Sequence, residues 1–209
     1  MPHRKMADAE FRADQHARLR DPHVKPINDF IDELRVIHGW TPYVAPLHAG
    51  ADARMLSVLR DPGDMTRDDD RGSGMICMEN DDQTAEKQAE LADAGGILPA
   101  EFMPWNSVPW YVDNRKPTTA ELHEATPSLV ALLDLLPKLE VVLLQGGEAQ
   151  RAWSYLRLAD PKWMRRGLTV IPTFHPSQSA LQTPDPDERA RRIAHRISAW
   201  KQAGKILHG

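Results

Sequence analysis

Four short apolar segments, each ending in a polar or glycine-rich turn, most constrain how this chain of 209 residues can fold. They cover residues 54–60, 101–108, 141–144 and 168–174, and their length suits buried strands. Amphipathic stretches lie between and around them, at 26–38, 83–94, after Thr118, from Gly147 to about Leu156, and at 186–203. This alternation predicts an α/β fold, a three-layer α/β/α sandwich around a central, mostly parallel, four-stranded sheet.

Length and composition favour one domain over residues 1–209, with residues 1–25 as a peripheral N-terminal extension. Hydrophobic residues make up 41 % of the chain, enough for a substantial core. No apolar run reaches the roughly 18 residues of a membrane span, and the first residues lack the apolar stretch of a secretory signal. We therefore expect a cytoplasmic protein without a membrane partner, and a monomer.

Cys77 is the only cysteine. One cysteine excludes an internal disulfide, a four-cysteine zinc site and an iron–sulfur cluster. The sequence also shows no spaced histidine or carboxylate ligands for a metal, and no glycine pattern for a nucleoside triphosphate or a dinucleotide. These observations predict a protein without a cofactor, in a reducing compartment.

The formal net charge of −4 argues against a nucleic-acid partner, but the charges are segregated. Residues 61–101 hold 12 acidic and 3 basic side chains, whereas residues 151–209 hold 4 acidic and 11 basic ones. One positive face is sufficient to contact a short stretch of DNA. On charge alone, the four arginines of the last helix are better explained as its solvent-facing side, opposite an apolar face of Ala190, Ile193, Ile197 and Trp200.

Polar side chains follow the predicted strands where ligands bind in parallel α/β sheets. They include a carboxylate (Asp61), an amide (Asn106), an imidazole (His175) and a hydroxyl (Ser177). Singly, each is more often a turn residue than a functional one. As a set they suit hydrolysis of an N-glycosidic bond: a carboxylate stabilises the sugar cation and orients water, an amide reads a base edge, and an imidazole donates to the departing base.

The chain resembles the uracil-DNA glycosylase superfamily, in its members without an iron–sulfur cluster. Four ordered pieces carry the resemblance: Leu-Arg-Asp-Pro-Gly at 59–63, Trp-Asn-Ser-Val-Pro-Trp at 105–110, Val-Leu-Leu-Gln-Gly-Gly at 142–147 and Phe-His-Pro-Ser at 174–177. The segment at 79–85 also looks like a turn of some members. Each piece alone is weakly specific. Their order, at successive strand ends, makes the combination specific.

The resemblance implies a role for each residue of the set. Asp61 would position water and support the sugar cation, His175 would hydrogen-bond the leaving base, and Asn106 would read the edge of uracil. The remaining implied contacts are of two kinds. Pro62, Gly63, Cys77 and Asn80 would lie near the substrate base, and Pro176, Ser177, Gly146 and Leu181 would contact the DNA backbone or act as the wedge that replaces a flipped nucleotide.

Two positions depart from the family pattern. Cys77 stands where many members carry a phenylalanine that stacks on uracil, so Met75, Met78 or Trp105 would have to substitute. Gly63 stands where uracil-strict members carry a tyrosine that excludes the thymine methyl. The motifs contain no lysine for a Schiff base. The resemblance thus implies a monofunctional glycosylase that excises uracil or a related deaminated base from DNA and leaves an abasic site.

Two alternatives remain at this stage. The protein could keep the fold and bind damaged or single-stranded DNA without turnover, which its net negative charge and Cys77 motivate. It could also be an unrelated α/β protein that binds free nucleotides at the helix start after Gly146-Gly147.

Overall fold

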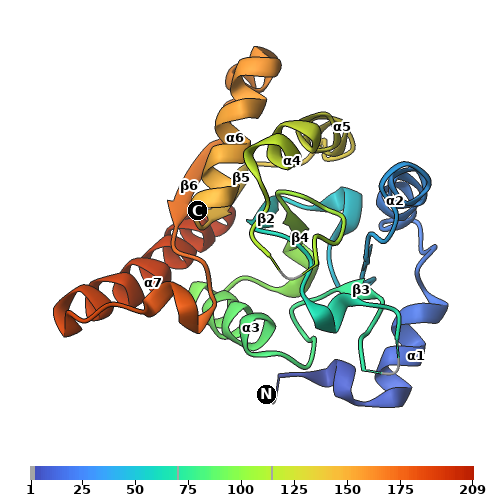
Figure 1. Ribbon diagram of the computed structural model, residues 1–209, viewed down its shortest axis with the longest axis horizontal. Helices are drawn as coiled ribbons and strands as arrows, with labels where there is room; N and C mark the ends of the chain where they lie inside the picture. Colours follow the sequence, from blue (N-terminus) through green and yellow to red (C-terminus); the bar gives the residue numbers. More distant parts are fainter. Residues whose placement is uncertain (1–2, 70, 114) are drawn as a thin grey trace.

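A computed structural model describes residues 3–69, 71–113 and 115–209, apart from the side chains of 163–165. The predicted four-stranded sheet is confirmed, and all of its strands run parallel in the order β4-β2-β5-β6 (Figure 1). Its strands are β2 (Met55–Leu59), β4 (Phe102–Asn106), β5 (Val141–Gln145) and β6 (Thr169–Thr173).

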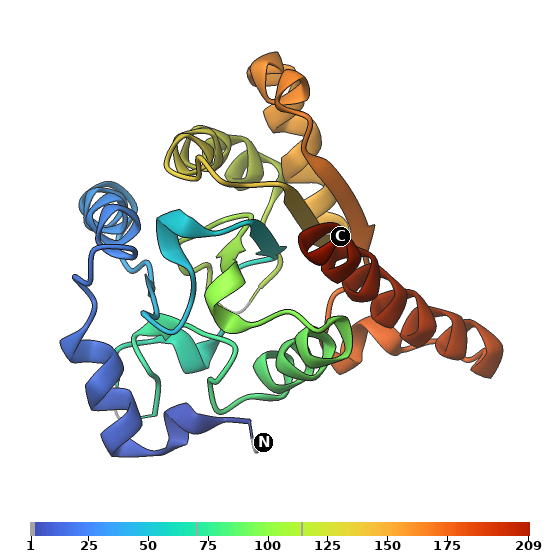
Figure 2. The same cartoon turned by 180° about the vertical axis from the view of Figure 1, so that it is seen from behind.

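Helices cover both faces of this sheet, as predicted (Figures 1 and 2). Successive strand residues point to opposite faces. Met55 packs toward α3 and α7, and the next residue, Leu56, packs toward α2, α5 and α6. The helix bounds are α2 (Lys25–His38), α3 (Gln83–Gly95), α4 (Thr119–Glu124), α5 (Thr126–Asp134), α6 (Gly147–Ala159) and α7 (Pro186–His208).

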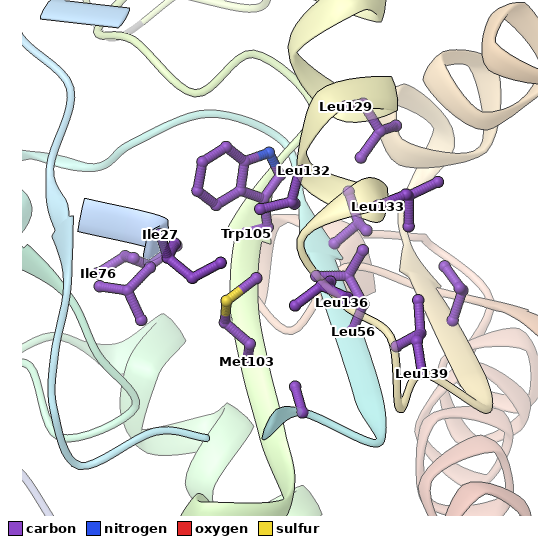
Figure 3. Packing of buried hydrophobic residues seen from close by; sticks show 14 of the residues in the cluster. Ile27, Leu56, Ile76, Met103, Trp105, Leu129, Leu132, Leu133, Leu136 and Leu139 are labelled. Atoms are coloured by element: carbon purple, nitrogen blue, oxygen red, sulfur yellow. The ribbon is translucent and has the colours of Figure 1, made fainter. Parts of the chain in front are cut away.

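The larger apolar core lies between the sheet and the helices α2 and α5 (Figure 3). Ile27, Leu56 and Leu132 are completely buried there. Trp105, one residue before the strand end, points into this core and stacks on Phe30, with ring centroids 6.3 Å apart. Its side chain is therefore a framework group.

The opposite layer is fixed by a close contact between α3 and α7. A Cβ atom on Gly204 would lie 1.9 Å from the carbonyl oxygen of Gly95, so the two backbones touch. This contact determines which face of α7 meets the sheet. Two of the four residues predicted for its apolar face are wrong, because Ala190 is exposed and Ile193 is 40 % exposed. The buried face contains Arg196, Ala199, Trp200, Ala203, Gly204 and Leu207.

The N-terminal segment packs against a second, two-stranded parallel sheet that the sequence did not reveal, β1 (Tyr43–Val44) with β3 (Met75–Ile76). The segment forms η1 (Lys5–Ala7) and α1 (Ala9–Ala17) at the periphery (Figure 1). The Met6 amide donates to the carbonyl of Glu79 at 2.9 Å, and the Leu47 amide donates to Oε1 of Gln15 at 2.8 Å. These bonds tie residues 6–15 to the loops beside β1 and β3.

Short 3-10 helices complete the chain, at η2 (Gly50–Asp52), η3 (Asp64–Thr66), η4 (Pro99–Glu101), η5 (Pro161–Arg166) and η6 (Gln178–Leu181). In the ranges described, none of the helices combines the length and apolar character needed to cross a bilayer.

Candidate active site at the carboxyl ends of the strands

Backbone hydrogen bonds hold the turns after the strands in two adjacent pairs. The amides of Ser107 and Val108 donate to the carbonyls of Leu59 and Arg60, at 2.9 and 3.2 Å, which joins the turns after β4 and β2. The Gly146 amide donates to the carbonyl of Thr173 at 2.8 Å, which joins the ends of β5 and β6. Since β2 and β5 are neighbours in the sheet, all four turns lie along one edge.

Asp61 is held in the turn after β2 with a side chain only 2 % exposed. Burial raises the pKa of its carboxyl group, because an ionised carboxylate loses hydration there. The neighbouring Arg60 opposes this shift. Its guanidinium contacts Oδ1 through Nε and lies 3.5 Å from Oδ2 through an Nη atom. Arg60 is the second-largest influence on the Asp61 pKa and favours the anion.

His175 lies in the turn after β6, and a contact to Nδ1 fixes which of its ring nitrogens carries the proton. The backbone N–H of Ser177 donates to Nδ1 at 3.2 Å, so Nδ1 is an acceptor and the neutral ring carries its proton on Nε2. Burial, together with the charges of Arg60 and Arg196, lowers the pKa of His175 to about 4. The imidazole is therefore neutral at physiological pH, with Nε2–H available as a donor.

Gly146 gives His175 the space that it occupies. A Cβ atom on Gly146 would lie 3.2 Å from the Cβ of His175, and the glycine has a φ of 100°, which side chains rarely adopt. Its amide is used within the sheet end, on the carbonyl of Thr173. In this structure Gly146 thus supports His175, beside the DNA-backbone role expected from the sequence.

Asn106 ends β4, level with Leu59 of β2. The residue is 3 % exposed, yet in the described parts of the chain no hydrogen bond uses its side-chain amide. Its amide atoms are not among the fully buried polar atoms without a partner, so water or a ligand can complete their hydrogen bonds. The amide is thus available for the base-reading role expected from the sequence.

Two other predicted substrate contacts are engaged inside the protein. Cys77 is 4 % exposed and packs with Met6 and Met75, and burial raises its pKa to about 12. The amide of Asn80 donates to the carbonyl of Met75 at 2.9 Å and accepts from Oγ of Ser73 at 2.7 Å. Both residues shape the loop before α3, and neither presents a free group to a base.

The remaining predicted contacts differ in exposure. Gly63 is exposed, with no atom within 4 Å of a Cβ built on it, whereas Pro62 is buried. Ser177 directly precedes η6, and its hydroxyl lies 2.9 Å from that of Ser179, while Pro176 is buried. Leu181 is only 6 % exposed, so this conformation does not present it at the surface as a wedge requires.

Arg196 is a site residue that sequence reasoning missed. It is 2 % exposed, and one of its Nη atoms donates to the carbonyls of both His175 and Ser177, the latter at 2.8 Å. Its assignment to the solvent side of the last helix is wrong. The available signal was its position four residues before Trp200, on the same face of α7.

A buried polar cluster lies at the end of β5. Gln145, the last residue of β5, is completely buried and donates to Oγ of Ser57 at 2.8 Å and to Oε1 of Gln88 at 3.2 Å. This cluster ties β5 and β2 to α3. In the portion of the chain described, no group of three His, Cys, Asp or Glu side chains is arranged to hold a metal ion.

Comparison with known protein families identifies the family of the chain. The family model described as the uracil DNA glycosylase superfamily matches residues 73–203, more than half of the chain. The chain belongs to this superfamily. The matched range includes Asn106 and His175 and begins after Asp61. No curated protein matches the chain.

Superfamily membership confirms the resemblance found in the sequence and agrees with the parallel sheet flanked by helices. It supports a DNA glycosylase type of activity and a DNA substrate. It argues against the alternative of an unrelated nucleotide-binding α/β protein.

Proposed function

We propose that this uracil-DNA glycosylase superfamily member is a monofunctional DNA glycosylase. It flips uracil or a related deaminated base out of DNA, hydrolyses the N-glycosidic bond and leaves an abasic site. The observation that carries the proposal is the position of Arg60, which contacts Asp61 and acts electrostatically on His175. One guanidinium, Arg60, favours ionised Asp61 and neutral His175 at the same time. These are the states that a water-positioning carboxylate and a hydrogen-bond-donating imidazole require.

The chemistry follows from the two side chains. As the bond to the base breaks, positive charge develops on the sugar and negative charge on the base. The Asp61 carboxylate stabilises the sugar cation and orients the attacking water. The Nε2–H of His175 donates to a carbonyl oxygen of the departing base, since Nδ1 is already occupied by the amide of Ser177. The free amide of Asn106 pairs with the donor and acceptor groups on the base edge.

The absence of a lysine from the strand-end motifs supports a hydrolytic reaction without strand cleavage. A lysine amine would be needed for a Schiff base with the opened sugar. Water, oriented by Asp61, is the nucleophile in the proposed reaction, and an intact abasic strand is its product.

The experiment is an excision assay on matched single- and double-stranded oligonucleotides that contain uracil, hypoxanthine or xanthine. Alkali then converts abasic sites to strand breaks. We expect breaks with the parent protein and a loss of about 100-fold or more with His175→Ala. If no base gives breaks above the level of Asp61→Asn and His175→Ala, the enzymatic proposal is wrong. Salt-sensitive DNA binding without base release would then identify a binding protein.

Gly63 bears on the choice of base. The space beside it is empty and its φ of −85° accepts any side chain, so a bulky residue fits there. We propose that the open space allows bases larger than uracil at position 5. Gly63→Tyr should reduce excision of 5-substituted uracils by about tenfold relative to uracil, whereas Gly63→Ala should preserve the ratio. An unchanged ratio with tyrosine would show that position 63 does not contact the base.

A further inference from the structure

Helix α7 holds the turn that carries His175 through two arginines one helical turn apart. An Nη atom of Arg196 donates to the carbonyls of His175 and Ser177. Arg192 donates to the carbonyls of Ala180 and Gln182, at 3.1 and 3.5 Å. The segment from His175 to Gln182 is therefore held at four carbonyls by one helix face. Only Arg196 reaches the part of this segment that contains His175.

The environment of Arg196 is unusual for an arginine. It is 2 % exposed, its Nε is buried without a partner, and within the described residues it forms no ion pair. Burial lowers its pKa to about 10, and no carboxylate counteracts this effect. A buried charge without a counter-ion costs stability. Packing alone would be served better by an apolar side chain beside Ala199 and Trp200.

The geometry points to Arg196 as a positioning residue for His175. One Nη atom of its guanidinium binds the carbonyls on both sides of Pro176 and so fixes the short arc from which the imidazole projects. That arc also contains the Ser177 amide, which donates to Nδ1 of His175. Through one pair of carbonyl contacts, Arg196 thus fixes both the place of the ring and the donor that selects its tautomer.

The charge of Arg196 adds a second effect on the same ring. Arg60 from the β2 turn and Arg196 from α7 are the two charged groups that act on His175, and both oppose its protonation. Removing Arg196 should leave His175 in its turn, but the orientation of the imidazole should be less well fixed. It should also make the imidazole easier to protonate.

The test compares Arg196→Met, Arg196→Lys and the control Arg189→Met, which removes the same charge from an exposed position on α7. The readouts are the pKa and tautomer of His175 from NMR of labelled imidazole, single-turnover excision and DNA affinity. For Arg196→Met we expect the pKa of His175 to shift from about 4 toward 6.5 and the imidazole to populate both tautomers. Excision should be 10- to 100-fold slower, about the cost of a misplaced catalytic group. DNA affinity should stay within about threefold of the parent. Arg196→Lys should restore the low pKa and part of the rate.

A His175 pKa and tautomer unchanged in Arg196→Met, with only the melting temperature lowered, would show a purely structural role and overturn the inference. If Arg196→Met does not fold, Arg196→Lys decides the question, because lysine keeps the charge but carries its nitrogen on a differently shaped side chain. A parent rate and parent tautomer in Arg196→Lys would overturn the positioning role. The rate readout rests on the proposed glycosylase activity, whereas the NMR readouts do not. An inactive parent protein would defeat the proposed function and still leave the positioning role measurable.

Discussion

The turn after β2 and the turn after β6 each bury a titratable side chain beside arginine, but they use the arginine differently. In the β2 turn, Arg60 bonds the carboxylate of Asp61 directly. In the β6 turn, Arg196 bonds the backbone around His175 and leaves the imidazole free. The first arrangement controls charge, and the second controls position and tautomer.

One site thus has to keep an acid ionised and a base neutral. Burial moves both pKa values toward the uncharged form, upward for Asp61 and downward for His175. For His175 this is the state needed, and the nearby cations reinforce it. For Asp61 it is the wrong state, and the direct contact with Arg60 counteracts it.

The largest effect is expected for Asp61→Asn, which should slow excision by about 10²- to 10⁴-fold. The same change should keep or raise the melting temperature at pH 7. Because the folded-state pKa of Asp61 is raised, ionisation disfavours the folded state as pH rises from below 3.8 through that pKa. Asparagine removes this cost, so the stability gain should vanish at pH 3. A lower melting temperature at pH 7 would mean that the ion pair with Arg60 is mainly structural.

Gly146→Ala should act on the β6 side of the comparison, with excision slower by about 100-fold. The added methyl group would press on the Cβ of His175 at 3.2 Å, and a φ of 100° disfavours alanine. Gly147→Ala is the matched control, because a Cβ there meets no atom within 4 Å. Thermal unfolding and single-turnover rates separate strain from catalysis. Equal rates for the two variants would show that His175 does not depend on Gly146 for its place.

Arg60→Gln tests the control of charge by the β2 turn. Excision at pH 6 should be about tenfold slower, which corresponds to one charge-assisted hydrogen bond. Both pKa values should rise, since Arg60 lowers that of Asp61 and that of His175. Each group works only above its pKa, so the loss should grow at pH 5 and shrink at pH 8.

Arg54→Gln is the control for Arg60→Gln. Arg54 pairs with Glu140 at the opposite edge of the sheet, with Nε 2.6 Å from Oε1. This variant should leave the pH profile unchanged. A uniform loss for Arg60→Gln at every pH would contradict the charge-setting role and indicate a contact with DNA instead.

The strands, their turns and the sites of Asp61, Asn106 and His175 could be predicted because they depend on local patterns. Apolar runs mark strands, and parallel strands must end at one edge. Arg196 could not be assigned in the same way. Its burial depends on how α7 rotates on the sheet, and the backbone contact between Gly95 and Gly204 determines that rotation. Within the helix, the spacing of Arg196 to Trp200 was the available signal, and it does not reveal the contact with Gly95.

Residues 1–25 and Cys77 show the same limit in another part of the molecule. Cys77 was aligned with a base-stacking position, but it packs beneath the N-terminal segment with Met6. That segment has no strong periodicity of its own and is held by partners far along the chain, such as Glu79. Long-range packing of this kind appears only when the chain is folded.

The smallest effect is expected for Ser177→Pro, which removes one backbone donor together with the side-chain hydroxyl. Ser177 has a φ of −60°, which proline adopts without strain, and its carbonyl remains available to Arg196. The loss of the N–H bond to Nδ1 of His175 should slow excision by about 3- to 10-fold, as expected for one hydrogen bond.

Ser177→Ala keeps that N–H and removes only the hydroxyl, so it isolates the tautomer effect. NMR of the imidazole should show protonated Nδ1 in part of the Ser177→Pro molecules and in none of the Ser177→Ala molecules. Slower excision in both variants with the parent tautomer would instead assign the effect to the hydroxyl, as a phosphate contact would. The β6 turn thus offers two separable groups, the backbone donor to Nδ1 of His175 and the Ser177 hydroxyl, which bonds Ser179 and which we propose as a contact for DNA.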